Sequence, residues 1–123
     1  MNRDPGSAGE PLPSPEAVLD EFRGAGALLE GHFILTSGRR SGHYMQCARA
    51  MVDPARGERL CKALAARIQD THPGLELDAV VAPAMGGILV GYELARQLGL
   101  PSFFTERVDG HFALRRGFEL AEG

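Results

Sequence analysis

The stretch from residue 80 to residue 90, VVAPAMGGILV, constrains the fold of this chain more than any other part of it. An apolar strand pattern runs into a Pro-Ala-Met-Gly-Gly turn, and a helical pattern follows at once. Such a turn places backbone N–H groups and a helix N-terminus at the carboxyl end of a strand, where α/β proteins bind phosphate or pyrophosphate. Glycine permits positive φ there, and its missing side chain lets an anion approach the main chain. The stretch therefore predicts an anion-binding site in an α/β fold.

Helical and strand-like patterns alternate along the rest of the chain. Ser14 and Pro15 are typical of the N-cap and first position of a helix, which Gly24 and Gly26 would end. The further expected elements are a hairpin of strands at 32–36 and 44–48 with a turn at 37–42, a helix at 54–71, a buried strand at 78–82, a helix at 86–99, a buried strand at 101–106 and a hairpin or mobile loop at 112–118. The order helix, strand, helix, strand from residue 54 predicts a parallel sheet flanked by helices.

Composition bounds the class of protein. A chain of 123 residues forms one domain at most, and its net charge of −3 offers no electrostatic basis for binding nucleic acid or a membrane. No apolar run approaches the ~20 residues of a membrane span, and the N-terminus lacks the order of a signal peptide. Cys47 and Cys61 fit neither a CxxC pair nor a disulfide framework. We therefore expect a cytoplasmic protein, with a disordered leader at residues 1–13 and a single domain at 14–123.

Three segments carry motifs in a fixed order: GHFILTSGRRSGHYMQC at 31–47, PAMGGILVGYELAR at 83–96, and FTERVDGHFALRRGF at 104–118. Together they resemble the N-terminal hood, the pyrophosphate loop with its helix, and the flexible catalytic loop of the orotate phosphoribosyltransferase family. The resemblance implies the α/β type I phosphoribosyltransferase fold, a parallel sheet flanked by helices with a small N-terminal hood, truncated at its C-terminus. The hood would occupy about 14–50 and the core about 54–123.

The resemblance also implies a reaction, the transfer of 5-phosphoribose from phosphoribosyl pyrophosphate to N1 of orotate, giving orotidine 5′-monophosphate and pyrophosphate. Mg²⁺ would be carried by the phosphoribosyl pyrophosphate, and the enzyme would be a homodimer. Two other functions stay open: a non-catalytic phosphoribosyltransferase-like module that regulates gene expression, and a phosphoribosyltransferase for another base. The hood sequence at 33–39 favours orotate because the hood selects the base. The acidic leader argues against a DNA-binding appendage.

The hood segment contains the candidates for orotate binding. A planar anionic pyrimidine needs a flat aromatic or apolar surface and donors for its carbonyls and carboxylate. Arg39 and Arg40 offer donors, and Tyr44 and Met45 offer the flat surface. The same residues also suit a solvated turn and core filler. The candidate residues are Thr36, Ser37, Gly38, Arg39, Tyr44 and Met45.

The pyrophosphate-loop candidates are Pro83, Ala84, Met85, Gly86 and Gly87. Backbone donors and the positive end of a helix would stabilise the charge that develops on the leaving pyrophosphate. The resemblance implies a non-proline cis peptide between Ala84 and Met85. Some relatives carry a lysine about where Gly86 stands, so here the contact would rest on the main chain alone. The alternative is a tight strand-to-helix turn that binds nothing.

The catalytic-loop candidates are Arg107, His111, Arg115 and Arg116. Displacement at the ribose anomeric carbon passes through an oxocarbenium-like state, so a lid that excludes water is expected. The family's loop carries a catalytic lysine, whereas this loop has none, and Lys62, the single lysine, lies elsewhere. His111 takes about its place, and partial protonation of a histidine predicts activity favoured by acid. Alternatively, His111 is an exposed residue without a role. A separate alternative for Arg115 and Arg116 is a solvated strand end paired to Glu119.

The family's next motif is an acidic pair on a strand followed by a Thr-Thr-Gly loop, which grips the ribose hydroxyls and the 5′-phosphate. No such run occurs in these 123 residues. A complete sheet of this type also needs more strands than 78–82 and 101–106 provide. We therefore expect the chain to represent the N-terminal two-thirds of the enzyme and to form no nucleotide by itself.

Overall fold

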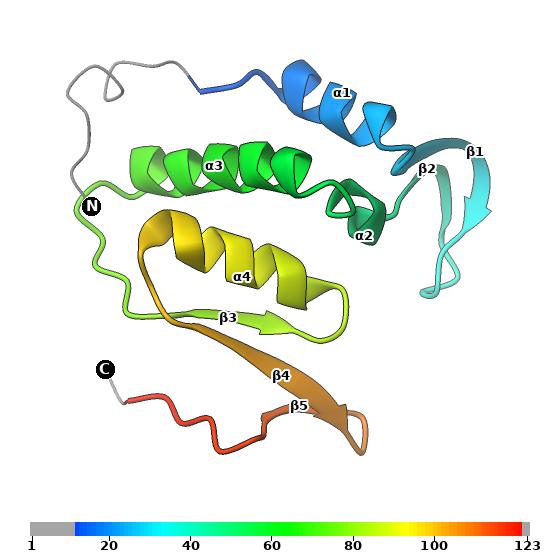
Figure 1. Cartoon of the computed structure of the whole chain (residues 1–123). Coiled ribbons are helices and arrows are strands. Elements are labelled where there is room, and N and C mark those ends of the chain that lie inside the picture. The colour runs from blue at the N-terminus through cyan, green and yellow to red at the C-terminus, as the bar shows by residue number, and fades with distance from the viewer. Residues whose placement is uncertain (1–11, 122–123) are drawn as a thin grey trace. The chain divides into compact units, whose positions relative to one another are not determined.

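The computed structural model describes residues 12–121, so most of the expected leader at 1–13 lies outside the described residues. The described residues fall into two compact units, an N-terminal one that ends at Ala63 and a C-terminal one that begins at Leu64 (Figure 1). The boundary lies inside the helix α3 (Pro54–Thr71), whose two ends match the predicted 54–71. No helix among residues 12–121 is both long and apolar enough to cross a membrane.

The N-terminal unit contains α1 (Pro15–Gly24), the strands β1 (Leu28–Ile34) and β2 (Arg40–Met45), the short helix α2 (Cys47–Ala50) and the first part of α3. The predicted start of α1 is confirmed, because the Ser14 hydroxyl accepts a hydrogen bond from the Ala17 N–H at 3.1 Å. The helix ends at Gly24, and Gly26 follows with a φ of 68°, a value that glycine adopts without strain. Local capping signals are therefore enough to place this helix.

The predicted hairpin in this unit is confirmed, but its boundaries were wrong. β1 begins and ends earlier than the predicted 32–36, and β2 begins inside the segment expected to be the turn. The turn is tighter than predicted because two hydrogen bonds close it. The Leu35 N–H donates to the Arg39 carbonyl and the Gly38 N–H donates to the Leu35 carbonyl, each at 2.8 Å.

The second strand of the hairpin also ends earlier than the predicted 44–48. The residues from Cys47 to Ala50 form α2 instead. The Gln46 N–H, directly after β2, donates to the carbonyl of Ala27 at 2.7 Å, and both Ala27 and Ala50 are buried. This hydrogen bond continues the register in which Leu28 pairs with Met45, so the ladder closes at Gln46 and the chain turns directly into α2.

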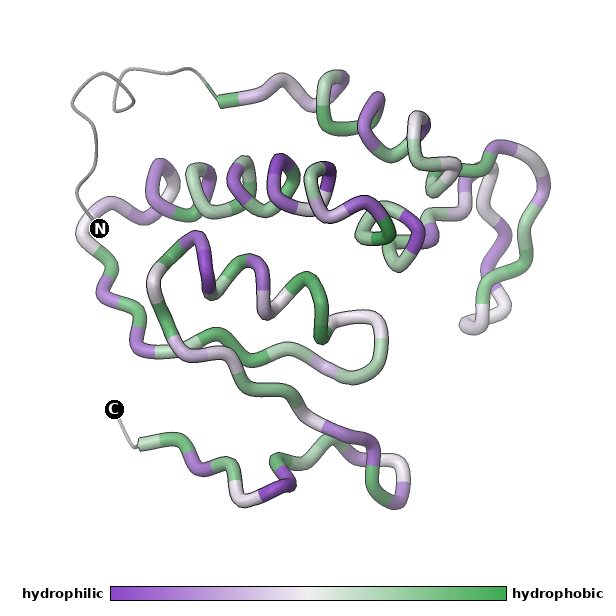
Figure 2. The backbone as a smooth tube through the Cα atoms, viewed as in Figure 1, coloured by the Kyte–Doolittle hydropathy of each residue, from purple (hydrophilic) through white to green (hydrophobic). Residues whose placement is uncertain are grey.

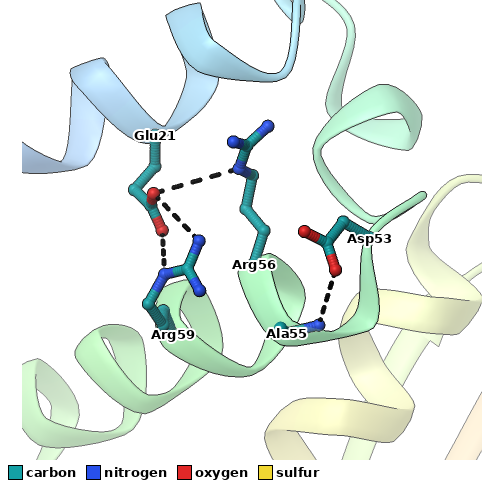
Figure 3. A network of polar contacts seen from close by, with 5 residues as sticks. All are labelled: Glu21, Asp53, Ala55, Arg56 and Arg59. Carbon is teal, nitrogen blue, oxygen red and sulfur yellow. Dashed lines mark hydrogen bonds and ion pairs between the residues drawn. The ribbon is translucent and has the colours of Figure 1, made fainter.

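An ion-pair network joins α1 to α3 within the N-terminal unit (Figure 3). The Arg59 guanidinium donates to both oxygens of Glu21, from Nε at 2.6 Å and from Nη2 at 3.2 Å, and Arg56 Nε lies 3.9 Å from the same carboxylate. The Asp53 carboxylate accepts from the Ala55 N–H at 3.0 Å and so caps the start of α3. The hydrogen bond from Arg59 holds the pKa of Glu21 below its ordinary value, so the pair is ionised at neutral pH.

Acid should weaken this network. Because Arg59 lowers the folded-state pKa of Glu21, the stabilisation from the carboxylate is fully present above the ordinary value of 4.5 and is lost as the pH falls through the lowered value. We expect Glu21→Gln to narrow the difference between the melting temperatures measured at about pH 7 and about pH 3.5. Glu30→Gln, which replaces an exposed glutamate of β1, is the matched control. If both substitutions narrow the difference between the two melting temperatures equally, the acid sensitivity does not come from the ion pair of Glu21 with Arg59.

The C-terminal unit contains the end of α3, the strands β3 (Val80–Pro83), β4 (Ser102–Val108) and β5 (His111–Leu114), and the helix α4 (Gly87–Leu98). The strands form one sheet in the order β3-β4-β5. β3 and β4 are parallel, as the alternating patterns predict, and α4 connects them and packs against both (Figure 1). β5 pairs with β4 in antiparallel register, so the segment expected as a hairpin or a mobile loop begins as a hairpin strand. The predicted end of α4 is confirmed, with Gly99 in the left-handed conformation at a φ of 71°.

The expectation that the strands at 78–82 and 101–106 are buried was wrong. Hydrophobic residues dominate β3 (Figure 2), yet they alternate between half-buried and exposed, and Val81 is 44% exposed. Val80 and Ala82 lie close to Gly91 of α4, whereas Val81 between them points to the opposite face of the sheet. Helix α4 therefore covers alternate residues of β3, and an apolar run alone does not report which face is covered.

Candidate active site

The loop between β3 and α4 has the geometry that the sequence resemblance implies. The peptide bond between Ala84 and Met85 is cis, although neither residue is proline. The Ala84 N–H donates to the Thr105 carbonyl of β4 at 2.8 Å, which ties the loop to the sheet. At the other end the Ile88 N–H donates to the Met85 carbonyl at 3.2 Å, while the Met85 side chain is 82% exposed. The loop is thus anchored at both ends and open to solvent between them.

The glycines at the start of α4 differ in what they do. A Cβ at Gly87 would lie 2.9 Å from Pro83 Cδ, and a Cβ at Gly91 would lie 2.7 Å from Ala82 Cβ. These two glycines let α4 pack closely on β3. A Cβ at Gly86 would meet no atom within 4 Å, and the φ of Gly86 is −62°. The expectation that glycine supplies positive φ in this turn was wrong, because the chain enters α4 through an ordinary right-handed conformation.

Gly86 is the N-cap of α4 and contributes no side chain to cap the N–H groups of the first turn. α4 has 12 residues, so its N-terminus carries a partial positive charge. Because the space where a Cβ would stand is open, an anion can approach the main chain here without displacing a side chain. The loop from Pro83 to Gly87 is therefore suited to a phosphate or pyrophosphate group.

The hood candidates lie in the β1–β2 hairpin. Its exposed turn contains Thr36, Ser37, Gly38 and Arg39. The Ser37 hydroxyl accepts a hydrogen bond from the Arg39 N–H at 3.4 Å, and Gly38 has a φ of 84°. The hydroxyl thus shapes the turn, and the guanidinium of Arg39 is exposed at its end.

Tyr44 and Met45 are consecutive residues of β2, so their side chains point to opposite faces of the hairpin. They therefore do not form one flat surface together. The Tyr44 ring lies 5.8 Å from the Phe33 ring of β1 instead, and Met45 is in register with Leu28. Phe33 and Tyr44 make up an aromatic pair in the hood. Sequence reasoning does not include Phe33 among the candidate binding residues. The signal that could have identified it is an aromatic residue on each strand of the predicted hairpin, since such residues pair across strands.

The β4–β5 hairpin contains the catalytic-loop candidates. Its two-residue turn consists of Asp109 with a φ of 51° and Gly110 with a φ of 82°, and Val108 is in register with His111. Positive φ at both central residues matches the turn that suits the twist of a hairpin. His111 is exposed at the tip. Asp109 and Gly110 thus close the hairpin, and His111 is the first residue after them.

The register of this hairpin separates two of the predicted cations. Arg107 is in register with Phe112, one pair before the closing pair that contains His111. Neighbouring pairs of an antiparallel ladder point to opposite faces, so Arg107 and His111 lie on opposite faces of the hairpin. The Arg107 guanidinium lies 5.0 Å from the centre of the Phe112 ring. Within this hairpin the structure therefore does not bring the two side chains together.

Arg116 lies at the base of the hairpin and is engaged there. Its Nε donates to the Glu106 carboxylate at 2.9 Å and its Nη2 donates at 3.2 Å, while its guanidinium lies 5.8 Å from the centre of the Phe104 ring. The hydrogen bond from Arg116 lowers the pKa of Glu106. The alternative in which Arg116 pairs with Glu119 was wrong, because the fold brings Glu106 of β4 to this guanidinium instead. Arg115, next to it, is exposed.

No protein-family model matches the chain. Among curated proteins, the chain is 56% identical over 108 residues to an orotate phosphoribosyltransferase from Erythrobacter litoralis, and 57% identical over 108 residues to one from Rhizorhabdus wittichii. The chain belongs to the orotate phosphoribosyltransferase family. Each match covers 88% of this chain and 55% of the relative. The chain thus spans about half the length of the curated relatives it matches.

Solved structures agree with this orotate phosphoribosyltransferase assignment. An orotate phosphoribosyltransferase from Aeropyrum pernix matches with a TM-score of 0.56 and 26% identity, covering 77% of this chain and 55% of that one. The type I phosphoribosyltransferase fold predicted from the motifs is therefore confirmed. Residues 12–121 contain no group of three or more His, Cys, Asp or Glu side chains placed to hold a metal ion.

The three orotate phosphoribosyltransferase motifs are divided between the two units. The hood turn belongs to the N-terminal unit, and the pyrophosphate loop and the β4–β5 hairpin belong to the C-terminal unit. Within the C-terminal unit the loop and the hairpin meet at Thr105, whose carbonyl accepts from Ala84 and whose next residue is Glu106. The structure therefore couples the pyrophosphate loop to the base of the hairpin, a link that sequence reasoning does not reveal.

Proposed function

We propose that this chain is part of an enzyme that transfers 5-phosphoribose from the magnesium complex of phosphoribosyl pyrophosphate to orotate. The bond between C1′ and the pyrophosphate oxygen breaks, the bond between C1′ and N1 of orotate forms, and N1 loses its proton. The products are orotidine 5′-monophosphate and magnesium pyrophosphate. The observation that carries the proposal is the open loop at the start of α4, whose N-cap has no capping side chain, in a chain so similar to proteins named orotate phosphoribosyltransferase.

The loop from Pro83 to Gly87 binds the pyrophosphate. Negative charge grows on this group as the C1′–O bond breaks, so donors that are already in place favour the transition state over the ground state. The N–H groups at the start of α4, which no side chain caps, are such donors, and the open space at Gly86 lets the anion approach them. Mg²⁺ would be brought in by the substrate and would supply further neutralisation of the pyrophosphate charge.

The hood turn binds the orotate. The exposed Arg39 guanidinium can donate two parallel hydrogen bonds to a carboxylate, and the hydroxyls of Thr36 and Ser37 can serve the ring carbonyls. The aromatic pair of Phe33 and Tyr44 offers a flat surface to a pyrimidine ring, and Met45 lies on the other face of the strand. Two other functions compete with this one: regulatory binding without catalysis, and transfer to another base. The experiment must distinguish both from transfer to orotate.

The decisive experiment uses the full-length protein with Mg²⁺ and phosphoribosyl pyrophosphate. The loss of orotate absorbance and the release of pyrophosphate are measured, with uracil and hypoxanthine as competing bases. We expect product with orotate alone. Binding of phosphoribosyl pyrophosphate without product from any base would support the regulatory module instead. The homodimer and the cytoplasmic location stay predictions, and sedimentation of the full-length protein tests the first.

His111 stands at the tip of the β4–β5 hairpin, directly after the turn of Asp109 and Gly110. We expect His111→Ala to lower kcat about tenfold or more and His111→Lys to retain activity, because a lysine at the tip also offers a hydrogen-bond donor to the leaving pyrophosphate. The rate of orotidine 5′-monophosphate formation from about pH 5.5 to about pH 8.5 is the measurement. His72→Ala, at an exposed histidine after α3, is the matched control. An unchanged rate and pH profile in His111→Ala would remove His111 from the site.

A further inference from the structure

The base of the β4–β5 hairpin is held by a cluster of side chains that the proposed chemistry does not use. Phe118 packs edge-on against Phe103 and Phe104, with ring centres 5.5 Å and 5.3 Å away. Arg116 lies over the outer part of the same cluster and holds both oxygens of Glu106. The segment after β5 is thereby folded back onto β4. We name these five residues, Phe103, Phe104, Glu106, Arg116 and Phe118, the base clamp.

The base clamp lies close to the residues at the tip. Glu106 is in register with Ala113, and the next pairs along the ladder are Arg107 with Phe112 and Val108 with His111. A slip of one residue in such a ladder turns every side chain to the other face. The ion pair between Arg116 and Glu106 holds Glu106 in its place in the ladder. It therefore also sets the faces of the hairpin to which Arg107 and His111 point.

The guanidinium of Arg116 is already committed to this contact. Two of its nitrogens donate to Glu106, and its plane is close to an aromatic ring that attracts a cation. The backbone of Arg116 has a φ of 60°, so the left-handed turn at this residue directs the side chain back along β4. An arginine that bound pyrophosphate would first have to give up both partners.

We propose that Arg116 is a positioning residue, which sets the register and facing of the lid through Glu106, and that it does not contact the pyrophosphate. The catalytic part of this inference rests on the proposed function, whereas the clamp itself does not. The pyrophosphate loop shares the same anchor, since the carbonyl of Thr105, next to Glu106, holds Ala84. Loosening the clamp should therefore disturb the lid and the neighbouring loop together.

The test exchanges the two charges in the full-length protein. Variants Arg116→Glu and Glu106→Arg each place like charges together, and the double variant restores an ion pair with its direction reversed. We expect each single variant to speed amide hydrogen exchange across residues 102–114 about fivefold and to lower kcat by a similar factor, with little change in KM for phosphoribosyl pyrophosphate. The double variant should recover both quantities to within about threefold of the parent. Arg115→Glu is the matched control for hydrogen exchange, and peptides from α3 report overall folding.

The outcomes separate the inference from the proposed function. Recovery of exchange protection and kcat in the double variant supports positioning. Two results overturn the inference, because each shows that Arg116 acts on the substrate. One is a double variant that regains protection from hydrogen exchange but not kcat. The other is a raised KM for phosphoribosyl pyrophosphate that the double variant does not lower again. Exchange in the single variants that equals exchange in the parent overturns the clamp. A parent protein that forms no product refutes the proposed function, and the hydrogen-exchange result still decides the clamp.

Discussion

Gly86→Asp is expected to lower kcat/KM for phosphoribosyl pyrophosphate about 100-fold or more, equivalent to about 2.7 kcal/mol of lost transition-state stabilisation. The substitution places a carboxylate in the open space beside the start of α4, where the proposed function places the pyrophosphate. Two like charges about 4 Å apart repel by about 4 kcal/mol at an effective dielectric constant of 20, which is ample for this loss. The measurement is steady-state formation of orotidine 5′-monophosphate at varied phosphoribosyl pyrophosphate.

Stability should change in the opposite direction, which separates a lost site from a damaged fold. A negative charge at the N-terminus of α4 interacts favourably with the helix dipole, by about 0.3–1 kcal/mol. Gly86→Asn is the matched control because it has the same shape without the charge, and we expect it to lose much less activity. If the aspartate variant keeps activity within about threefold of the asparagine variant, the loop does not bind the pyrophosphate.

Gly91→Val is expected to destabilise the protein by about 3 kcal/mol, the largest stability effect of a single substitution that we predict. Even the Cβ would lie 2.7 Å from Ala82 Cβ, an atom fixed to the backbone of β3, so α4 would have to move away from the sheet. The gain in helix propensity over glycine is less than about 1 kcal/mol and does not offset this clash. Denaturant unfolding followed by circular dichroism gives the difference in free energy.

The matched control for this prediction is Gly86→Ala, at the N-cap of the same helix, where a Cβ meets no atom within 4 Å. We expect it to change the free energy of unfolding by less than about 0.5 kcal/mol. A second comparison tests the contact itself: Ala82→Gly should reduce the cost of Gly91→Ala, because it removes the atom that clashes. Fully additive effects of these two substitutions would contradict the close packing of α4 on β3.

The elements that the sequence predicts well are those whose ends depend on neighbouring residues. Ser14 caps α1 from three residues away, and Gly99 ends α4 by adopting a conformation that other residues avoid. The cis peptide at Ala84 was also predicted, from a motif rather than from physics, and is confirmed. These features are local, so the residues that cause them are adjacent in the chain.

The elements that the sequence predicts poorly depend on residues far apart in the chain. The last hydrogen bond of the β1–β2 ladder joins Gln46 to Ala27, and the partner of Arg116 is Glu106 on β4. Neither partner can be chosen without the register of a hairpin. The alternation of a strand likewise separates Tyr44 from Met45 and Arg107 from His111, although each pair is close in sequence.

The sequence by itself determined that this chain has a strand, a glycine turn and a helix in series, and that three motifs in order belong to the orotate phosphoribosyltransferase family. It also determined which residue types are available to bind an anion and a planar base. Only the tertiary structure decided that Gly91 serves packing while Gly86 keeps the main chain open, and that Arg116 is held by Glu106. The physical reason is that composition and spacing specify local backbone conformation, whereas free space and charge partners arise when distant segments pack together.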